Sequence, residues 1–512
     1  MTFWDLVAAT AMRAPQQMVL ADDHGRSLTA SALRDAALGT AAALHERGVG
    51  PGTVVSWQLP TTLETMVVMV ALARLGALQN PIIPILRERE VEFITRQIAA
   101  ELLLVPETWR GFAYGAMARS LAGGSLAVQI VDHDTDPAST AGRLRLPAGD
   151  PSQLPAPPTD ADAVRWLYFS SGTTANPKGV RHTDTSVMAG ANGVVGMFGA
   201  SGSDVNPLAF PISHIGGSAM LTASLLTGMQ LVLFEVFDPA TSAHRIALHH
   251  PTMLGSATPF FQAFIAAQRA HGGEPLFPEL RGCVGGGAPI TPALNAEVRA
   301  VLGVPGVANA WGLTEFPVAT SPAPDAPSEV LDHTVGPPVP GVRVRVVDDS
   351  GRVLGVGEEG ELRLQGPQCF KGYVDATLDA DAFDGEGWFR TGDLGMVDAD
   401  GNVRVTGRQK DAIIRNAENI SAQEVELVLT GHPAVADVAV IGVPDERTGE
   451  HVCAIVVLVP GASLTLSELV DHCRADGLPR FKHPEQLELI DALPRNAMGK
   501  VLKKDLRRQH GS

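Results

Sequence analysis

The sequence predicts an α/β protein with two domains, and three observations lead to that prediction. The chain has 512 residues, which is more than one hydrophobic core usually supports. Up to residue 304 it alternates strand-like and helix-like apolar patterns, which favours doubly wound sheets covered by helices. From residue 342 onward, short strands of alternating polarity appear. We therefore expect a large N-terminal domain over 1–409, with a small β-barrel at about 335–407, and a smaller mobile α+β domain over 410–512.

The first elements follow from apolar spacing. Helical periodicity covers 28–44, 61–75 and 88–99, and strand-like runs lie between these segments at 54–59 and 78–85. Strands that alternate with helices are typical of parallel sheets, because each helix carries the chain back to the edge where the next strand begins.

The next element is the stretch 166–180, WLYFSSGTTANPKGV, in which an apolar strand runs into a loop of small hydroxylated residues. Gly172 and Gly179 let the backbone approach an anion closely, and Lys178 adds a positive charge. Hydroxyl and N–H groups of the loop can donate to phosphate oxygens. The spacing is not that of a Walker A loop. Such a loop is more often a plain turn, so its interpretation as a phosphate-binding loop depends on the motifs that follow.

After Pro337 the pattern becomes antiparallel. Valine and arginine alternate over 342–347, the segment DDSG turns the chain, and 361–364 alternates again. ADG at 399–401 is another hairpin signal. The last hundred or so residues carry their own αβ pattern and are long enough for a compact domain.

Composition narrows the possible functions. A net charge of −17 and a pI near 5.3 argue against a general nucleic-acid or anionic-membrane binder. The four cysteines form no C-x-x-C pair, so neither a zinc site nor a disulfide framework is indicated. The N-terminus lacks a signal-peptide pattern, and the longest weakly charged stretch, 219–234, is short for a membrane span. We expect a soluble, cytoplasmic protein.

Five further motifs follow the loop in order: FPISHIGG at 210–217, VGGGAPIT at 284–291, NAWGLTE at 309–315, TGDLG at 391–395 and PRNAMGK at 494–500. Three of them have a plain structural interpretation. A histidine beside two glycines is usually part of a turn, three glycines after a strand form a strand-to-helix connection, and Thr-Glu at a helix start is a cap. Their combination and order carry the functional prediction.

In that order the six motifs resemble those of the acyl-adenylate-forming superfamily, which includes acyl-CoA synthetases, luciferases and peptide-synthetase adenylation domains. The stretch 80–93, NPIIPILREREVEF, resembles the cyclohexanecarboxylate-CoA ligase-like members. The resemblance covers essentially the whole chain. It implies an AMP-forming carboxylate-CoA ligase that uses ATP, Mg²⁺ and coenzyme A, with an alicyclic, aromatic or polycyclic acid as substrate.

The resemblance also implies a nucleotide site. Its residues would be Ser170, Ser171, Gly172, Thr173, Thr174, Lys178, Gly287, Ala288, Pro289, Asn309, Ala310, Trp311, Gly312, Thr314, Asp393 and Arg408. Asn309 would bind the adenine edge and Trp311 would stack on the ring. Asp393 and Arg408 would hold the ribose.

Catalytic roles follow from the same resemblance. They fall to Lys500, Thr314, Glu315 and His214: Thr314 would bond the α-phosphate, Glu315 would help hold Mg²⁺, and Lys500 would bridge the carboxylate and the α-phosphate. A carboxylate beside a triphosphate makes physical sense only with a cation between them.

The acyl and thiol sites are implied in the same way. The acyl pocket would be lined by His214, Gly216, Gly217, Ala257 and Gly312, where small residues leave room for a bulky ring system. Coenzyme A would contact Asn416, Ala417, Glu418, Asn419, Phe481 and His483. Lys410 would be the hinge on which the C-terminal domain turns between the two half-reactions.

Some positions depart from the family pattern. Ala175 replaces a glycine of the phosphate loop, Trp311 replaces the common tyrosine, and Asn416 with Ala417 replaces a glycine pair. Two alternatives therefore stay open beside the complete ligase: a half-ligase that makes the thioester from an acyl-adenylate supplied by a separate adenylating enzyme, and a nucleotide- or acyl-binding protein without turnover. A homodimer is a further open expectation.

Overall fold

The computed structural model describes residues 1–123, 126–132, 144–170, 177–287, 289–415, 418–445, 447–496 and 499–510. Several predicted site residues lie outside these ranges: Ser171, Gly172, Thr173, Thr174, Ala288, Asn416 and Ala417. The departure at Ala175 lies outside them as well.

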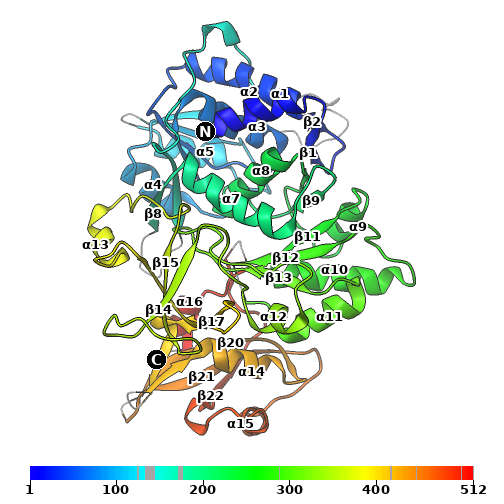
Figure 1. Ribbon diagram of the computed structural model, residues 1–512, viewed down its shortest axis with the longest axis vertical. Coiled ribbons are helices and arrows are strands. Elements are labelled where there is room, and N and C mark those ends of the chain that lie inside the picture. Colours follow the sequence, from blue (N-terminus) through cyan, green and yellow to red (C-terminus); the bar gives the residue numbers. More distant parts are fainter. Residues whose placement is uncertain are drawn as a thin grey trace.

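The N-terminal body is built on three sheets that carry parallel strands (Figure 1). The largest has the order β6-β5-β3-β4-β7-β8, with strands β3 (Val54–Trp57), β4 (Leu78–Pro81), β5 (Leu102–Val105), β6 (Ala127–Ile130), β7 (Val164–Ser170) and β8 (Lys178–Thr183). The second has the order β2-β1-β10-β9, with β1 (Met18–Asp22), β2 (Ser27–Thr29), β9 (Val205–Leu208) and β10 (Gln230–Leu233). The third comprises β11 (Met253–Ser256), β12 (Gly282–Gly286) and β13 (Val307–Ala310).

Helices cover these sheets. They are α1 (Phe3–Arg13), α2 (Ala30–His45), α3 (Leu63–Leu75), α4 (Glu88–Gln97), α5 (Tyr114–Leu121), α7 (Asp184–Phe198), α8 (Ile215–Thr227), α9 (Ser242–Ala247), α10 (Thr258–His271), α11 (Pro292–Leu302) and α12 (Ser328–His333). Helix α3 is buried along its whole length, which fits its nearly continuous apolar sequence. It begins after Thr62, whose hydroxyl caps the Thr65 N–H, and ends at Gly76 with a positive φ of 69°.

The unit expected as a small β-barrel is a four-stranded antiparallel sheet in the order β14-β15-β16-β17. Its strands are β14 (Arg343–Val347), β15 (Gly360–Gln365), β16 (Phe389–Val397) and β17 (Val403–Arg408), and a 3₁₀ turn, η2 (Ala376–Leu378), with the short helix α13 (Asp379–Ala382) lies between β15 and β16. Phe316, Leu362, Leu364 and Phe389 share one buried cluster, so this sheet packs onto the segment after β13.

The C-terminal unit follows η3 (Gln409–Asp411), which contains Lys410. Its sheet has the order β19-β18-β21-β20, with β22 beside β21. The strands are β18 (Ala412–Arg415), β19 (Glu418–Ser421), β20 (Val435–Asp445), β21 (Gly449–Leu458) and β22 (Gln486–Leu489), and the helices are α14 (Ala422–Thr430), α15 (Leu466–Ala475) and α16 (Lys503–His510). The unit has its own buried clusters and lies at the opposite end of the molecule from the N-terminus (Figure 1). None of the described helices is both long and apolar enough to cross a bilayer.

Candidate active site

One edge of the third sheet collects several predicted nucleotide-binding residues. In β12 and β13, Gly285 pairs with Asn309 and Gly286 with Ala310, in parallel register. The carboxyl ends of the two strands therefore place Gly287 beside the start of the Trp311 segment. A Cβ on Gly285 would come within 2.9 Å of Asn309 Oδ1, so this glycine lets the two strands approach. Gly287 has a φ of 79° and open space where a Cβ would stand, and Pro289 is exposed.

Trp311, Asp393 and Arg408 form a contact group next to this edge. The Trp311 indole N–H donates to Asp393 Oδ2 at 2.8 Å. Arg408 Nε lies 2.6 Å from the other oxygen, Oδ1. No donor among the described residues is aligned to hydrogen bond that buried Oδ1. A buried acceptor without an aligned donor is costly to leave unmet, so Asp393 is suited to accept from the hydroxyl of a ligand.

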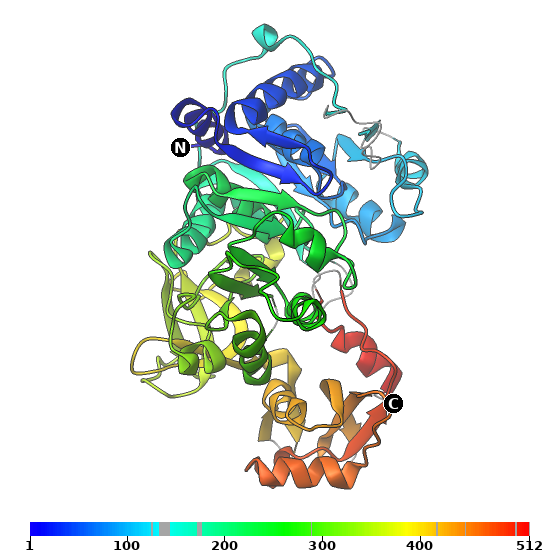
Figure 2. The same ribbon diagram turned by 90° about the vertical axis from the view of Figure 1, so that its right-hand side faces the viewer.

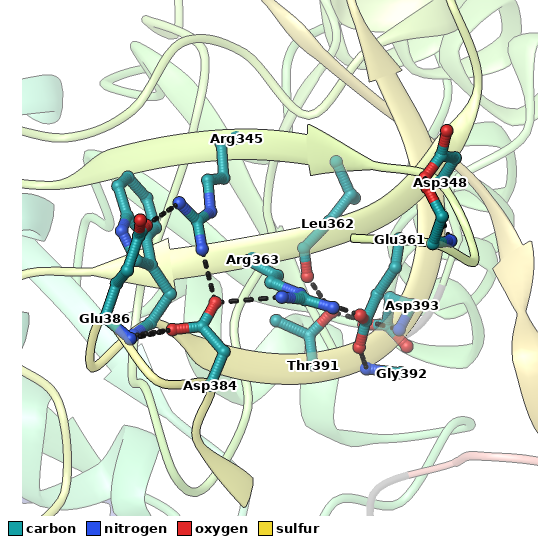
Figure 3. Close-up of polar contacts among 12 residues, drawn as sticks. Arg345, Asp348, Glu361, Leu362, Arg363, Asp384, Glu386, Thr391, Gly392 and Asp393 are labelled. Carbon is teal, nitrogen blue, oxygen red and sulfur yellow. Dashed lines mark hydrogen bonds and ion pairs between the residues drawn. The ribbon is translucent and has the colours of Figure 1, made fainter. Parts of the chain in front are cut away.

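The backbone at Asp393 is held by the antiparallel sheet, as Figure 3 shows. The Asp393 N–H donates to Thr391 Oγ1 at 3.0 Å, and the Gly392 N–H lies 3.4 Å from Glu361 Oε1. Glu361 in turn accepts from Arg363, whose other end donates to Asp384 at 2.8 Å. Because Glu361 and Arg363 are both buried, this paired network is weakly screened by solvent. It ties the Asp393 strand to β15.

Thr314 and Glu315 lie in a turn, not at the start of a helix, so helix capping does not explain this Thr-Glu pair. His182 Nε2, on β8, lies 2.8 Å from the Thr314 carbonyl, and its Nδ1 lies 2.9 Å from Ser186 Oγ. Burial lowers the pKa of His182 to about 4, so the ring is neutral at pH 7 and Nε2 carries the proton given to Thr314.

Glu315 is held from the other side by Tyr373. The tyrosine hydroxyl donates to Glu315 Oε1 at 2.9 Å, and the Glu315 carbonyl accepts from the Phe370 N–H. Burial, together with the neighbouring Glu315 charge, raises the pKa of Tyr373, so the phenol stays a donor. Lys178 Nζ lies 5.3 Å from the centre of the Tyr373 ring. The strand that leaves the predicted phosphate loop is thus linked to Glu315.

The donor set around Glu315 fits a magnesium ion shared with a substrate. Mg²⁺ usually takes one or two protein carboxylates and completes its shell with phosphate oxygens and water. Among the described residues, no three His, Cys, Asp or Glu side chains gather into a cluster of their own. Glu315 would therefore be the ligand supplied by this part of the chain.

The acyl side of the site is centred on His214, at the start of α8. His214 Nδ1 accepts from the Gly216 N–H at 3.1 Å, and burial lowers the pKa of His214 to about 4. A narrow cavity of about 20 Å³, room for one water, lies beside it. Its walls come from four segments of the N-terminal body: Pro81, Ile83, Tyr168, Phe169, Ser213, His214, Ile215 and Thr314.

The glycines expected to leave room for the acid have a different role here. A Cβ on Gly217 would stand 2.6 Å from the Ile212 backbone, and one on Gly312 would stand 2.6 Å from the Val318 N atom. Both are needed because backbone packs against them, so they provide no open space for a ring. Ala257 is buried and precedes helix α10.

The turn that carries Lys500 reaches the N-terminal body. The Lys500 N–H donates to Asn496 Oδ1 at 2.9 Å, and the Gly499 N–H donates to the Asn496 carbonyl. Gly499 has a φ of 78°, and its Cβ position lies 3.7 Å from the Pro259 ring at the start of α10. Figure 2 shows the C-terminal segment rising from its own sheet to this part of the body. Since α10 follows β11, the turn approaches the sheet edge that carries Gly287 and Trp311.

Four of the residues expected to meet coenzyme A, Glu418, Asn419, Phe481 and His483, lie within the described ranges, on different segments of the C-terminal unit. His483 is buried, and its Nε2 lies 2.7 Å from the Leu478 carbonyl, which gives this ring a structural contact within the C-terminal unit. Phe481 is partly exposed in η4 (Arg480–Lys482). Glu418 and Asn419 lie in β19.

Two residues near the site were not predicted from the sequence, His182 and Tyr373. His182 lies four residues after Lys178 in KGVRHTD, and Tyr373 follows a glycine in FKGYVD. Nothing in either segment indicates a contact to Thr314 or Glu315. Their role depends on pairing between β8 and the segment after Phe370, where the Val374 N–H donates to the Gly179 carbonyl. That pairing joins residues almost two hundred positions apart and is a property of the fold.

Known proteins resemble the chain over its full length. Residues 7–374 match the family described as AMP-binding enzyme, and residues 424–500 match the AMP-binding enzyme C-terminal domain. The salicyl-AMP ligase / salicyl-S-ArCP synthetase of Mycobacterium tuberculosis strain H37Rv is 34% identical, covering 99% of this chain and 90% of that one. The medium-chain fatty-acid-CoA ligase of Escherichia coli K12 is 31% identical, covering 98% and 89%. The crystal structure of ATP-bound MatB from Rhodopseudomonas palustris superposes with a TM-score of 0.87 at 26% identity, covering 100% and 99%.

Proposed function

The chain belongs to the AMP-binding enzyme family, and we propose that this AMP-forming acid-CoA ligase activates an alicyclic, aromatic or polycyclic carboxylic acid. It would first form the acyl-adenylate from the acid and ATP, then transfer the acyl group to coenzyme A. We propose that this one chain catalyses both half-reactions.

The observation that carries this proposal is the position of the Lys500 turn. The turn belongs to the C-terminal unit, yet Gly499 lies against Pro259 of the N-terminal body. That contact brings the lysine-bearing turn to the start of α10, which follows β11 in the sheet whose strand β13 leads into Trp311. A protein that only binds a nucleotide has no need of a second domain delivering a lysine there, so the arrangement favours turnover.

The chain's own groups would act as follows in the first step. The ribose would lie against Asp393 and Arg408, and the phosphates would lie between Lys178, Thr314 and the Lys500 ammonium. The acid's carboxylate oxygen attacks the α-phosphorus, and pyrophosphate leaves with the electrons of the broken P–O bond. Lys500 lowers the repulsion between the two anions and stabilises the charge that develops at phosphorus. Mg²⁺ held by Glu315 would neutralise charge on the phosphates.

The second step replaces AMP with a thiol. The sulfur of coenzyme A attacks the acyl carbonyl, and AMP leaves. We propose that the C-terminal unit turns about Lys410 so that the Lys500 turn withdraws and β19 comes forward. Lys410 lies in the short η3 turn between β17, the last strand of the antiparallel sheet, and β18, the first strand of the C-terminal unit.

The acid class rests on a sequence resemblance and on one relative. The stretch 80–93 supplies two of the residues that line the narrow cavity, Pro81 and Ile83, beside the aromatic residues Tyr168 and Phe169. The relative with 34% identity is named for salicyl, an aromatic acyl group. Because the cavity holds only about 20 Å³, we expect the His214 side to shift when a ring enters.

The test is pyrophosphate exchange with Mg·ATP over a panel of alicyclic, aromatic, polycyclic and linear acids. In parallel, thioester formation is measured from coenzyme A and the matching synthetic acyl-adenylates. Lys500→Ala is expected to abolish exchange while thioester formation from the adenylate continues. Lys504→Ala, an exposed lysine on α16, is the control and should leave both unchanged.

Each outcome has a definite meaning. Exchange only with long linear acids would refute the proposed acid class. Thioester formation from an adenylate with no exchange for any acid would identify a half-ligase supplied by another enzyme, and absence of both reactions would overturn the ligase.

A further inference from the structure

We propose that Trp311 is a positioning residue for Asp393 and makes the enzyme select ribonucleoside over deoxyribonucleoside triphosphates. The inference rests on the proposed function, in which Asp393 receives the ribose hydroxyls. Its basis is the hydrogen bond of 2.8 Å from the Trp311 indole N–H to Asp393 Oδ2. A tyrosine, which is common at this position in the family, has no N–H on the side of its ring.

The arrangement leaves each carboxylate oxygen with a separate task. Oδ2 is occupied by the indole, while Oδ1 is buried, lies 2.6 Å from Arg408 Nε, and has no aligned hydrogen-bond donor among the described residues. Asp393 is 2% exposed, so water cannot easily satisfy Oδ1. A ribose hydroxyl is a donor of the right kind for this oxygen, because hydrogen bonds to a charged acceptor are strong.

Arg408 is the reason the indole contact matters. A guanidinium binds a carboxylate best through two parallel N–H···O bonds. Without the indole N–H, the Asp393 carboxylate is free to rotate and pair with Arg408 through both oxygens. Asp393 Oδ1, the acceptor proposed for the ribose hydroxyl, would then be hydrogen bonded to Arg408 instead. Trp311 prevents this by holding Oδ2 on the opposite side.

Trp311 itself is well fixed. Its backbone N–H donates to the Thr320 carbonyl at 3.0 Å, and the residue is 8% exposed within the cluster that includes Phe316. The backbone at Asp393 is fixed separately, because the Asp393 N–H donates to the Thr391 hydroxyl and the preceding Gly392 N–H donates to Glu361 (Figure 3). The contact therefore joins two rigid segments 82 residues apart.

The experiment measures dissociation constants by calorimetry for Mg·ATP, Mg·2′-deoxy-ATP and Mg·3′-deoxy-ATP with the full-length protein. Trp311→Phe and Trp311→Tyr both remove the indole N–H, and Tyr, the residue of the family pattern, keeps the test open if the Phe variant folds poorly. A change in stacking on the adenine alters the binding of all three nucleotides alike. The ratio of the dissociation constants of a deoxy analogue and ATP therefore isolates the ribose contact. Asp393→Asn, measured alone and together with Trp311→Phe, completes a double-mutant cycle that measures the coupling between the two residues.

A matched control lies elsewhere in the chain. The Trp166 indole N–H donates to Asp184 Oδ1, also at 2.8 Å, in the buried core. Trp166→Phe removes the same kind of bond and is expected to lower the melting temperature without changing the nucleotide ratios.

We expect the wild type to prefer ATP over at least one deoxy analogue, and both Trp311 variants to reduce that preference by about tenfold. In the Asp393→Asn background, Trp311→Phe should cause no further loss. Ratios unchanged in both variants, or a wild type that binds all three nucleotides equally, would overturn this inference alone. A wild type that binds no ATP would instead overturn the adenylation step of the proposed function.

Discussion

Replacing Tyr373 with phenylalanine tests how Glu315 is kept ready for a metal ion. The change removes one hydroxyl, the donor to Glu315 Oε1 at 2.9 Å. Glu315 is 9% exposed, so its carboxylate gains little from water in exchange. A hydrogen bond to a charged group contributes about 1.5 to 3 kcal/mol. We expect Tyr373→Phe to lower the free energy of unfolding by an amount in that range.

The positive charge of Lys178 decides whether Tyr373→Phe raises or lowers the Mg²⁺ requirement. Losing the donor returns a lone pair to Glu315, which by itself would favour a cation. Lys178 Nζ, however, lies 5.3 Å from the centre of the Tyr373 ring, and we expect the released carboxylate to turn toward this ammonium. We therefore expect the Mg²⁺ concentration for half-maximal pyrophosphate exchange to rise about tenfold, which corresponds to about 1.4 kcal/mol.

Another tyrosine, Tyr114, supplies the control. The chain contains three, and Tyr114 donates to the Pro84 carbonyl at 2.6 Å in a buried setting away from Glu315. Tyr114→Phe should lower the melting temperature and leave the Mg²⁺ requirement as in the wild type. If Tyr373→Phe loses stability but keeps the same Mg²⁺ requirement, then Tyr373 only supports the fold, and our account of Glu315 is wrong.

Two further predictions concern stability. Because burial lowers the pKa of His182 from 6.5 to about 4, the unfolded chain takes up this proton first. Stability from this group is complete above pH 6.5 and should fall by up to about 3 kcal/mol as the pH drops to 4; chemical denaturation across this range should show a smaller fall in His182→Gln, and an equal fall would contradict the assignment. Gly217→Ala and Gly312→Ala should each cost about 1 to 3 kcal/mol, because the new methyl would stand 2.6 Å from backbone atoms. Gly196→Ala in α7, where a methyl meets nothing within 4 Å, should be neutral or stabilising by up to about 1 kcal/mol, and equal losses at all three positions would refute the packing argument.

The sequence determined the class of fold and the identity of most candidate residues. Apolar periodicity located β3, β4, α2, α3 and α4 to within a few residues, because each of these elements buries one face or its whole surface. The motif NAWGLTE was found from residue types alone. Such short-range patterns are readable because local propensity and burial agree over consecutive residues.

The tertiary structure decided how those residues are used. Gly217 and Gly312 looked like space for a ring, but only the fold shows that the Ile212 and Val318 backbones occupy that space. Trp311 was a departure from the common tyrosine and was expected only to stack on the adenine, and the fold gives its indole N–H to Asp393. Tyr373 and His182 carried no recognisable pattern. The Gly217 and Gly312 contacts join residues only a few positions apart, but the path of the turn that brings the backbones together depends on how the surrounding elements pack. The contacts of Trp311, Tyr373 and His182 join residues 82, 58 and 132 positions apart, and sheet pairing, which no local stretch of sequence encodes, sets their distances.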